Sequence, residues 1–146
     1  MVDNCVFCAI VEGKIPSYKV YEDEKTLAFL DIHPSAPGHT LLIPKIHVAQ
    51  VEDLPEEDAR ALFASLHKIV GRIQNAIGAP ATTIGINNGR ENGQEVPHVH
   101  VHIIPRKQGD KGSMIQGISR SPPNLDSDEM VRIAREIRDR IKDERS

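Results

Sequence analysis

The sequence contains no apolar run long enough to cross a membrane and no large excess of charge of either sign. No window approaches the roughly 18 consecutive apolar residues of a membrane span, and the opening M-V-D-N-C lacks the apolar stretch of a signal peptide. The 18 Lys and Arg against 21 Asp and Glu give a net charge of -3, with both signs mixed throughout, which excludes an extended basic surface for nucleic acid or an anionic membrane. We therefore expect a cytoplasmic protein with neither partner, in which a small anionic ligand needs a local site.

Cysteine is also scarce: only Cys5 and Cys8 occur. Because they lie three positions apart, a disulfide between them cannot crosslink distant parts of the fold. A C-x-x-C pair in a cytosolic chain is more often a metal or redox site than a structural disulfide. A thioredoxin-like redox pair needs a preceding buried strand in a β-α-β context, which the short N-terminal stretch does not supply. The pair therefore favours a metal site, with free thiols as the alternative.

The length of 146 residues suits one compact core, so we expect a single domain over residues 1–146. Residues 18–31 hold two short β-prone runs around an acidic turn, which predicts a hairpin. A loop rich in proline and glycine follows, and then T-L-L-I-P at residues 40–44, which predicts a buried strand that the proline ends.

Two amphipathic helices are predicted by apolar residues that recur three and four positions apart. The first covers residues 53–78, where Asp53, followed three positions later by a glutamate, resembles a capping box and Gly78 ends the helix. The second covers about 126–143, after an irregular segment at 106–124 that is rich in Gly, Ser, Pro, Lys and Asp.

The most informative stretch is V-P-H-V-H-V-H-I-I-P at residues 96–105, which follows a predicted strand at 81–88 and a polar, glycine-containing loop. His98, His100 and His102 alternate with aliphatic residues, and side chains two positions apart on a strand share one face. The final proline is expected to end this strand. Several antiparallel strands with two helices predict an α+β fold.

A row of three histidines is difficult to explain by packing alone, because each buried imidazole needs hydrogen-bond partners. A single metal ion bound by all three is also disfavoured, since His98 and His102 start roughly 13 Å apart on a strand that rises about 3.3 Å per residue. Nucleophilic catalysis fits better: one neutral imidazole attacks a phosphoryl group while a neighbour donates hydrogen bonds to its oxygens.

The segment H-V-H-V-H-I-I resembles the motif of the histidine triad (HIT) family, His-φ-His-φ-His-φ-φ with φ apolar. The resemblance extends over D-I-H-P-S-A-P-G-H-T-L-L-I-P-K, N-N-G-R-E-N-G-Q-E-V-P and C-V-F-C-A-I, so it covers roughly residues 5–110. It implies a HIT-like fold of five antiparallel strands with two helices, usually paired as a homodimer, which binds a purine nucleotide across the triad strand.

The resemblance also implies roles for the catalytic residues. His100 is the nucleophile that takes up the nucleotidyl group, which water then removes, and His102 hydrogen-bonds the phosphate. His39 packs against the triad and supports the nucleophile.

The same resemblance implies a nucleotide-binding set. Asp31 binds the ribose hydroxyls, Ile32 lies beside the base and Asn87 contacts the phosphate. The loop that cradles the phosphate consists of Gly93, Gln94, Glu95 and Val96. Glu95 departs from the pattern, because many members carry Ser or Thr there, and a carboxylate cannot donate a hydrogen bond unless it is protonated.

Some members of the HIT family combine an N-terminal C-x-x-C with two histidines to hold zinc. The resemblance to them implies a structural zinc site formed by an N-terminal segment of about residues 1–15 together with two histidines from later in the chain. The ligands implied here are Cys5, Cys8, His47 and His98. Four such ligands suit tetrahedral zinc. The metal would not take part in the chemistry.

The expected activity is hydrolysis or transfer at the α-phosphate of a nucleoside 5′-phosphoramidate, an adenylylated adduct or a dinucleoside polyphosphate, through a covalent nucleotidyl-histidine. The product is AMP or GMP. The alternative is a nucleotide-binding adaptor or sensor with little turnover, against which the presence of His100 argues. A zinc-dependent hydrolase is a third class, and it would lose activity directly on chelation.

Overall fold

The computed structural model describes residues 4–145, so residues 1–3 of the expected zinc-binding segment lie outside the described residues. The chain divides into two compact units, residues 1–112 and 113–146. The expectation of one domain over the whole chain stays a prediction.

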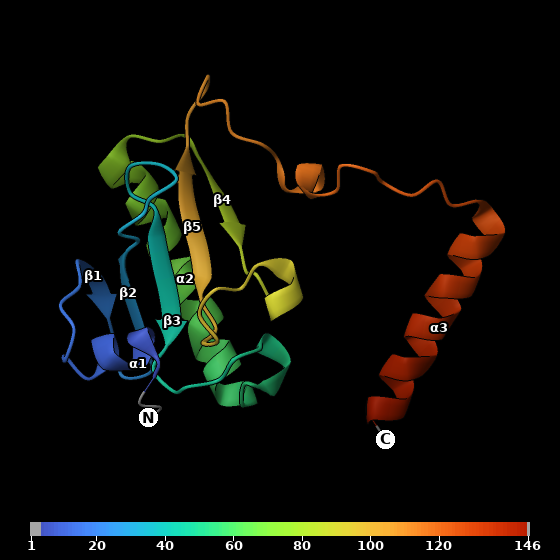
Figure 1. Ribbon diagram of the computed structural model, residues 1–146, viewed down its shortest axis with the longest axis horizontal. Coiled ribbons are helices and arrows are strands. Elements are labelled where there is room, and N and C mark those ends of the chain that lie inside the picture. The colour runs from blue at the N-terminus through green and yellow to red at the C-terminus, as the bar shows by residue number, and fades with distance from the viewer. Residues whose placement is uncertain (1–3, 146) are drawn as a thin grey trace. The chain divides into compact units, whose positions relative to one another are not determined.

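The first unit is built on a five-stranded antiparallel sheet (Figure 1). Its strands are β1 (Lys19–Glu22), β2 (Thr26–Leu30), β3 (Thr40–Pro44), β4 (Ala81–Gly85) and β5 (Val101–Arg106). They lie in the order β1-β2-β3-β5-β4. The predicted hairpin, the strand at 40–44 and the five-stranded antiparallel sheet are confirmed.

One face of the sheet packs against the long helix α2 (Glu56–Ile77). The core on this side contains Ala28, Leu42, Leu62, Leu66, Ile69, Val99, Val101 and Ile103, all of them buried. The aliphatic residues between the histidines therefore point toward α2, as the period-two pattern predicts. The histidine side chains therefore lie on the opposite face of the sheet.

The opposite face is covered at one end by α1 (Val6–Val11), a short helix that the sequence reading did not include. Its buried cluster consists of Cys5, Phe7, Cys8, Leu27, Phe29, Leu41 and Ile43. Alternate residues of β2 and β3 thus face α2 and α1 in turn, which is why both strands are buried along nearly their whole length.

The predicted start of α2 was wrong in detail. Helix α2 begins at Glu56 with Pro55 as its N-cap, and no side chain caps it. Asp53 cannot form the expected capping box because it ends a separate 3-10 turn, with an extended Leu54 between that turn and the helix. Gly78 ends the helix in a left-handed conformation, as predicted.

Strand β5 is also placed differently from the prediction, because it begins only at Val101 and continues through Pro105. The segment before it bonds elsewhere: the Val99 N–H donates to the Val48 carbonyl at 2.8 Å. Pro105 is tolerated because β3 pairs with β5 only as far as Ile103, so β5 has a partner on one side alone at the proline.

The second unit contains a 3-10 turn (Ile115–Ile118) and α3 (Ser127–Arg145), close to the predicted helix at 126–143. Across residues 4–145 no helix combines the length and apolar character needed to cross a bilayer. The expectation of a cytoplasmic protein stays a prediction.

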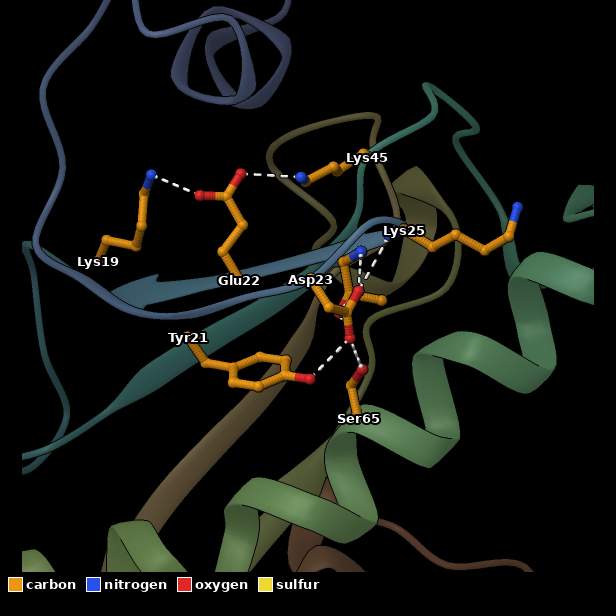
Figure 2. A network of polar contacts seen from close by, with 8 residues as sticks. Lys19, Tyr21, Glu22, Asp23, Lys25, Lys45 and Ser65 are labelled. Carbon is orange, nitrogen blue, oxygen red and sulfur yellow. Dashed lines mark hydrogen bonds and ion pairs between the residues drawn. The ribbon is translucent and has the colours of Figure 1, made fainter.

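Asp23 joins the β1–β2 turn to α2 (Figure 2). One carboxylate oxygen accepts the backbone N–H groups of Lys25 and Thr26 and the Thr26 hydroxyl, at 2.8–3.0 Å. The other accepts the hydroxyls of Tyr21 and Ser65, at 2.7 and 3.0 Å. Burial raises the pKa of the Asp23 carboxyl, but these hydrogen bonds outweigh it and hold the pKa well below its usual range.

We expect Asp23→Ala to lower the free energy of unfolding by about 2–3 kcal/mol at neutral pH, because several donors lose a charged acceptor together. Urea denaturation measures the loss, with the exposed Glu24→Ala as the matched control. Because the folded pKa is depressed, the carboxylate stabilises above its unfolded pKa, and the gap to wild type should close as the pH falls. A variant as stable as wild type would contradict this role.

Candidate functional site

The histidine face of the sheet borders a cavity of about 330 Å³. Its lining includes the predicted nucleotide contacts Asp31, Ile32, Glu95, Val96, His100 and His102. Val6, Phe7 and Ile10 of α1 form an apolar wall. Ile32 is 71% exposed, an unusual position for isoleucine and one that leaves an apolar surface free for a flat ring.

Four side chains from three stretches of the chain converge and could bind a metal: Cys5, Cys8, His47 and His98. The Cys5 sulfur lies 3.4 Å from His98 Nδ1, and the Cys8 sulfur lies 3.3 Å from His47 Nδ1 and 3.7 Å from His98 Nδ1. A tetrahedral zinc ion, with Zn–S and Zn–N bonds of about 2.3 and 2.0 Å, sets sulfur and nitrogen roughly 3.5 Å apart. The donor set and its spacing therefore fit zinc.

The protonation of His98 supports this fit. Its Nε2 lies 2.8 Å from the Pro44 carbonyl oxygen, which can only accept a hydrogen bond. Nε2 therefore carries the hydrogen, and the Nδ1 lone pair faces the two cysteine sulfurs. His98 is fully buried, and burial lowers its pKa, which keeps the ring neutral as a metal ligand requires.

His100 has the opposite tautomer. Its Nδ1 lies 2.8 Å from the His98 carbonyl oxygen, so Nδ1 carries the hydrogen and Nε2 is left unprotonated in the neutral ring. The His100 ring also makes a T-shaped contact with Phe7, with ring centroids 5.1 Å apart. A lone pair on a 94% buried ring, fixed by a backbone acceptor and an aromatic neighbour, suits nucleophilic attack.

His102 receives a hydrogen bond from His39, and this pair forms a relay. The Ser35 N–H donates to His39 Nδ1 at 3.0 Å, so His39 carries its hydrogen on Nε2 and donates it to His102 Nδ1 at 2.9 Å. His102 must then carry its own hydrogen on Nε2. The ring is thereby set as a hydrogen-bond donor beside His100, with ring centroids 5.0 Å apart.

Asp31, His39 and His102 also lie close enough together to bind a metal. The relay argues against that use, because the Ser35 N–H occupies the only lone pair of the neutral His39 ring. The Asp31 carboxylate, 3.6 Å from His39 Nε2, faces the same ring electrostatically.

Burial, reinforced by the nearby His100 and His39, lowers the pKa of His102 to about 4. The unfolded chain takes up this proton near pH 6.5, so it binds more protons than the folded protein between pH 6.5 and 4. We therefore expect the free energy of unfolding to fall as the pH falls through this window. Above this pH window the His102 ring stays neutral and keeps its hydrogen bond with His39.

His102→Gln should flatten this pH dependence in urea denaturation, while His67→Gln, on the exposed side of α2, should retain the wild-type slope. Equal slopes for wild type and His102→Gln would show that His102 does not titrate in this range.

Several of the other predicted site residues do not touch His100 or line the cavity. His39 contacts His102 and not His100, so any support for the nucleophile passes through His102. The Gln94 amide is buried and bonds to the Ala49 carbonyl and the Gly89 N–H, at 2.7 and 2.8 Å. Asn87 and Gly93 are not part of the cavity lining.

Sequence reasoning missed two contributors to this site. Phe7 of α1 packs edge-on against both His98 and His100. His33 also lines the cavity, and its N–H donates to the Asp31 carboxylate. The apolar sequence V-F-C-A-I-V around Cys8 could have indicated α1. The helix was missed because its N-cap is Cys5, and cysteine is not among the residues that usually cap a helix.

The fold and the site together define a class: an antiparallel sheet that carries a histidine row beside a ligand-sized cavity and a Cys/His cluster. Residues 12–109 match the family model described as the HIT domain. The chain therefore belongs to the HIT domain family.

Several known proteins resemble the chain over most of their length. Adenosine 5′-monophosphoramidase hnt1 of Schizosaccharomyces pombe is 37% identical over 95% of this chain and 99% of its own. The crystal structure of SMU.412c from Streptococcus mutans is 40% identical, with a TM-score of 0.88 over 97% of this chain and 87% of that one. A Zn-bound histidine triad family protein from Mycobacterium smegmatis is 41% identical, with a TM-score of 0.69 over 82% and 84%.

Proposed function

We propose that this protein is a nucleotide hydrolase or transferase that acts at the α-phosphate through a covalent nucleotidyl-His100. The substrates are nucleoside 5′-phosphoramidates, adenylylated adducts or dinucleoside polyphosphates, and the product is AMP or GMP. The observation that carries the proposal is the pair of tautomers, which leaves a lone pair on His100 Nε2 beside a hydrogen-bond donor on His102. A relative that is an adenosine 5′-monophosphoramidase supports it.

In the first step, His100 Nε2 forms a bond to the α-phosphorus as the bond to the leaving group breaks. The leaving group departs with the electron pair and takes a proton from water. Positive charge develops on the imidazole, and the Nδ1–H bond to the His98 carbonyl stabilises it. The His102 Nε2–H donates to a non-bridging oxygen of the phosphoryl group.

In the second step, water attacks the phosphorus and the bond to Nε2 breaks. The electron pair returns to His100, and the water's proton is released to solvent with the nucleoside monophosphate. The same lone pair that attacked is thus restored for the next turnover.

The rest of the nucleotide is proposed to contact residues around the cavity. Asp31 accepts from the ribose hydroxyls and Ile32 packs on the purine, both in the cavity lining. Asn87 and the loop from Gly93 to Val96 surround the phosphate, with Gln94 acting by fixing the loop's backbone.

We propose that Cys5, Cys8, His47 and His98 hold a structural zinc ion. The spacing of the four ligand atoms and the zinc-bound relative support this assignment. The ion holds α1 in place through both sulfurs, and it supplies no step of the reaction.

We propose a homodimer as the working form. Strand β4 lies at one edge of the sheet, with Ile84 37% exposed, so a second copy can pair along that edge. Neither nucleic acid nor a membrane is expected as a partner.

The proposal is tested by incubating the purified protein with adenosine 5′-phosphoramidate and with diadenosine polyphosphates, and following AMP release with and without a chelator. We expect AMP release, with an initial rate that chelation leaves intact. No release from any substrate would favour a nucleotide-binding adaptor or sensor. Immediate loss of the rate on chelation would favour a zinc-dependent hydrolase.

A further inference from the structure

The proposed nucleotide cavity has an unexpected charge. Its lining contains two carboxylates, Asp31 and Glu95, and no lysine or arginine. Sites for anionic phosphates usually supply cationic side chains. Here the histidines supply hydrogen bonds instead, and the fixed charge of the wall is negative.

The two carboxylates differ in what they bind. Asp31 accepts the His33 N–H at 2.9 Å and lies 3.6 Å from His39, and its remaining acceptor capacity is assigned to the ribose hydroxyls in the proposed function. Glu95 is exposed, and within residues 4–112 it forms no hydrogen bond or ion pair. Its charge is therefore available to a ligand.

The backbone of Glu95 is held from both sides. Gln94 before it is anchored by its buried amide to Ala49 and Gly89. Val96 after it packs on the α1 cluster, and its carbonyl accepts the His98 N–H at 2.8 Å. The free carboxylate is thus presented to the cavity by a fixed loop, which is how a recognition group is built.

A substrate bound beside the Glu95 carboxylate needs a positive charge to compensate it. The phosphate is anionic, and the ribose and the purine base are uncharged near neutral pH. The leaving group is the only part of the substrate that can carry the charge. Resting on the proposed function, we propose that Glu95 selects nucleoside phosphoramidates whose leaving amine carries a second, positively charged amino group.

The inference separates the substrate classes that the site otherwise allows. A dinucleoside polyphosphate has an anionic leaving group, which Glu95 repels. An amine with a distal ammonium group is attracted. Glu95 therefore acts as a specificity-determining residue and has no part in bond breaking.

The test uses three adenosine 5′-phosphoramidates of similar length, made from 1,4-diaminobutane, butylamine and 4-aminobutyrate. Their free ends are positive, neutral and negative. We expect wild-type kcat/KM to rank them in that order, with about fivefold or more between the positive and neutral ends at low salt. The ranking should weaken as the ionic strength rises.

Glu95→Gln should compress the ratio of positive to neutral substrate toward one, and Glu95→Lys should invert it. Glu91→Gln, a glutamate of the same loop that does not line the cavity, should keep the wild-type ratio. Because each ratio is taken within one variant, a change in overall activity does not affect it. An unchanged ratio in Glu95→Gln overturns this inference alone, whereas no turnover of any substrate by wild type overturns the proposed function with it.

Discussion

His100→Ala is expected to lower kcat/KM for adenosine 5′-phosphoramidate by about 10⁴-fold or more, because loss of a nucleophile removes the covalent route entirely. Neither of the other two histidines of the triad is a ready substitute. His102 has its Nδ1 engaged by His39 and its hydrogen on Nε2, and the His98 Nδ1 lone pair faces the cysteine sulfurs. AMP release in steady-state assays measures the effect.

The control for this variant is binding. His100→Ala should retain AMP affinity within a few fold, since Asp31 and Ile32 keep their place in the cavity wall. His67→Ala, an exposed histidine on α2, should keep full activity. Wild-type turnover by folded His100→Ala would remove His100 from the chemistry.

Loss of the two thiols proposed to bind zinc is expected to have the largest effect on stability. Cys5→Ser with Cys8→Ser should bind no zinc and should unfold about 10 °C lower, or about 3 kcal/mol less stably, because binding energy at a structural zinc site is folding energy. Both cysteines are almost fully buried, at 4% and 1% exposure. Metal analysis and thermal unfolding measure the two effects.

The same variant should raise KM more than it lowers kcat, because α1 carries Phe7 into the cavity wall while His100 keeps its bond to the His98 carbonyl. Incubation of wild type with a chelator until the metal is removed should reproduce the lower stability and the higher KM, whereas the initial rate measured on adding the chelator stays intact. Wild type that purifies without metal and is as stable as the double variant would contradict the zinc assignment.

The residues that could be read from the sequence are those whose pattern is local. The alternation of His98, His100 and His102 with aliphatic residues fixes which face each occupies, and β5 and α2 confirm it. The spacing of apolar residues likewise locates α2 and the hairpin. These features depend on neighbours within a few positions of the chain.

The features that escaped prediction depend on contacts between distant segments. Nothing near Asp53 shows that its side chain is displaced from α2 by a separate turn. The choice of His102 as the partner of His39 depends on how β3 and β5 pair across 63 positions of sequence. The tautomer of each histidine is set by a carbonyl or an N–H that only the folded chain brings near.

The covalent intermediate is the central claim, and it can be trapped. Wild type is mixed with adenosine 5′-phosphoramidate, quenched in alkali, where a phosphorus–nitrogen bond to histidine survives, and analysed by peptide mass spectrometry. We expect one adenylyl group on the peptide that contains His100, lost on brief exposure to acid and absent from His100→Ala. Rapid AMP formation with no adenylylated peptide, or with the label on another residue, would contradict it.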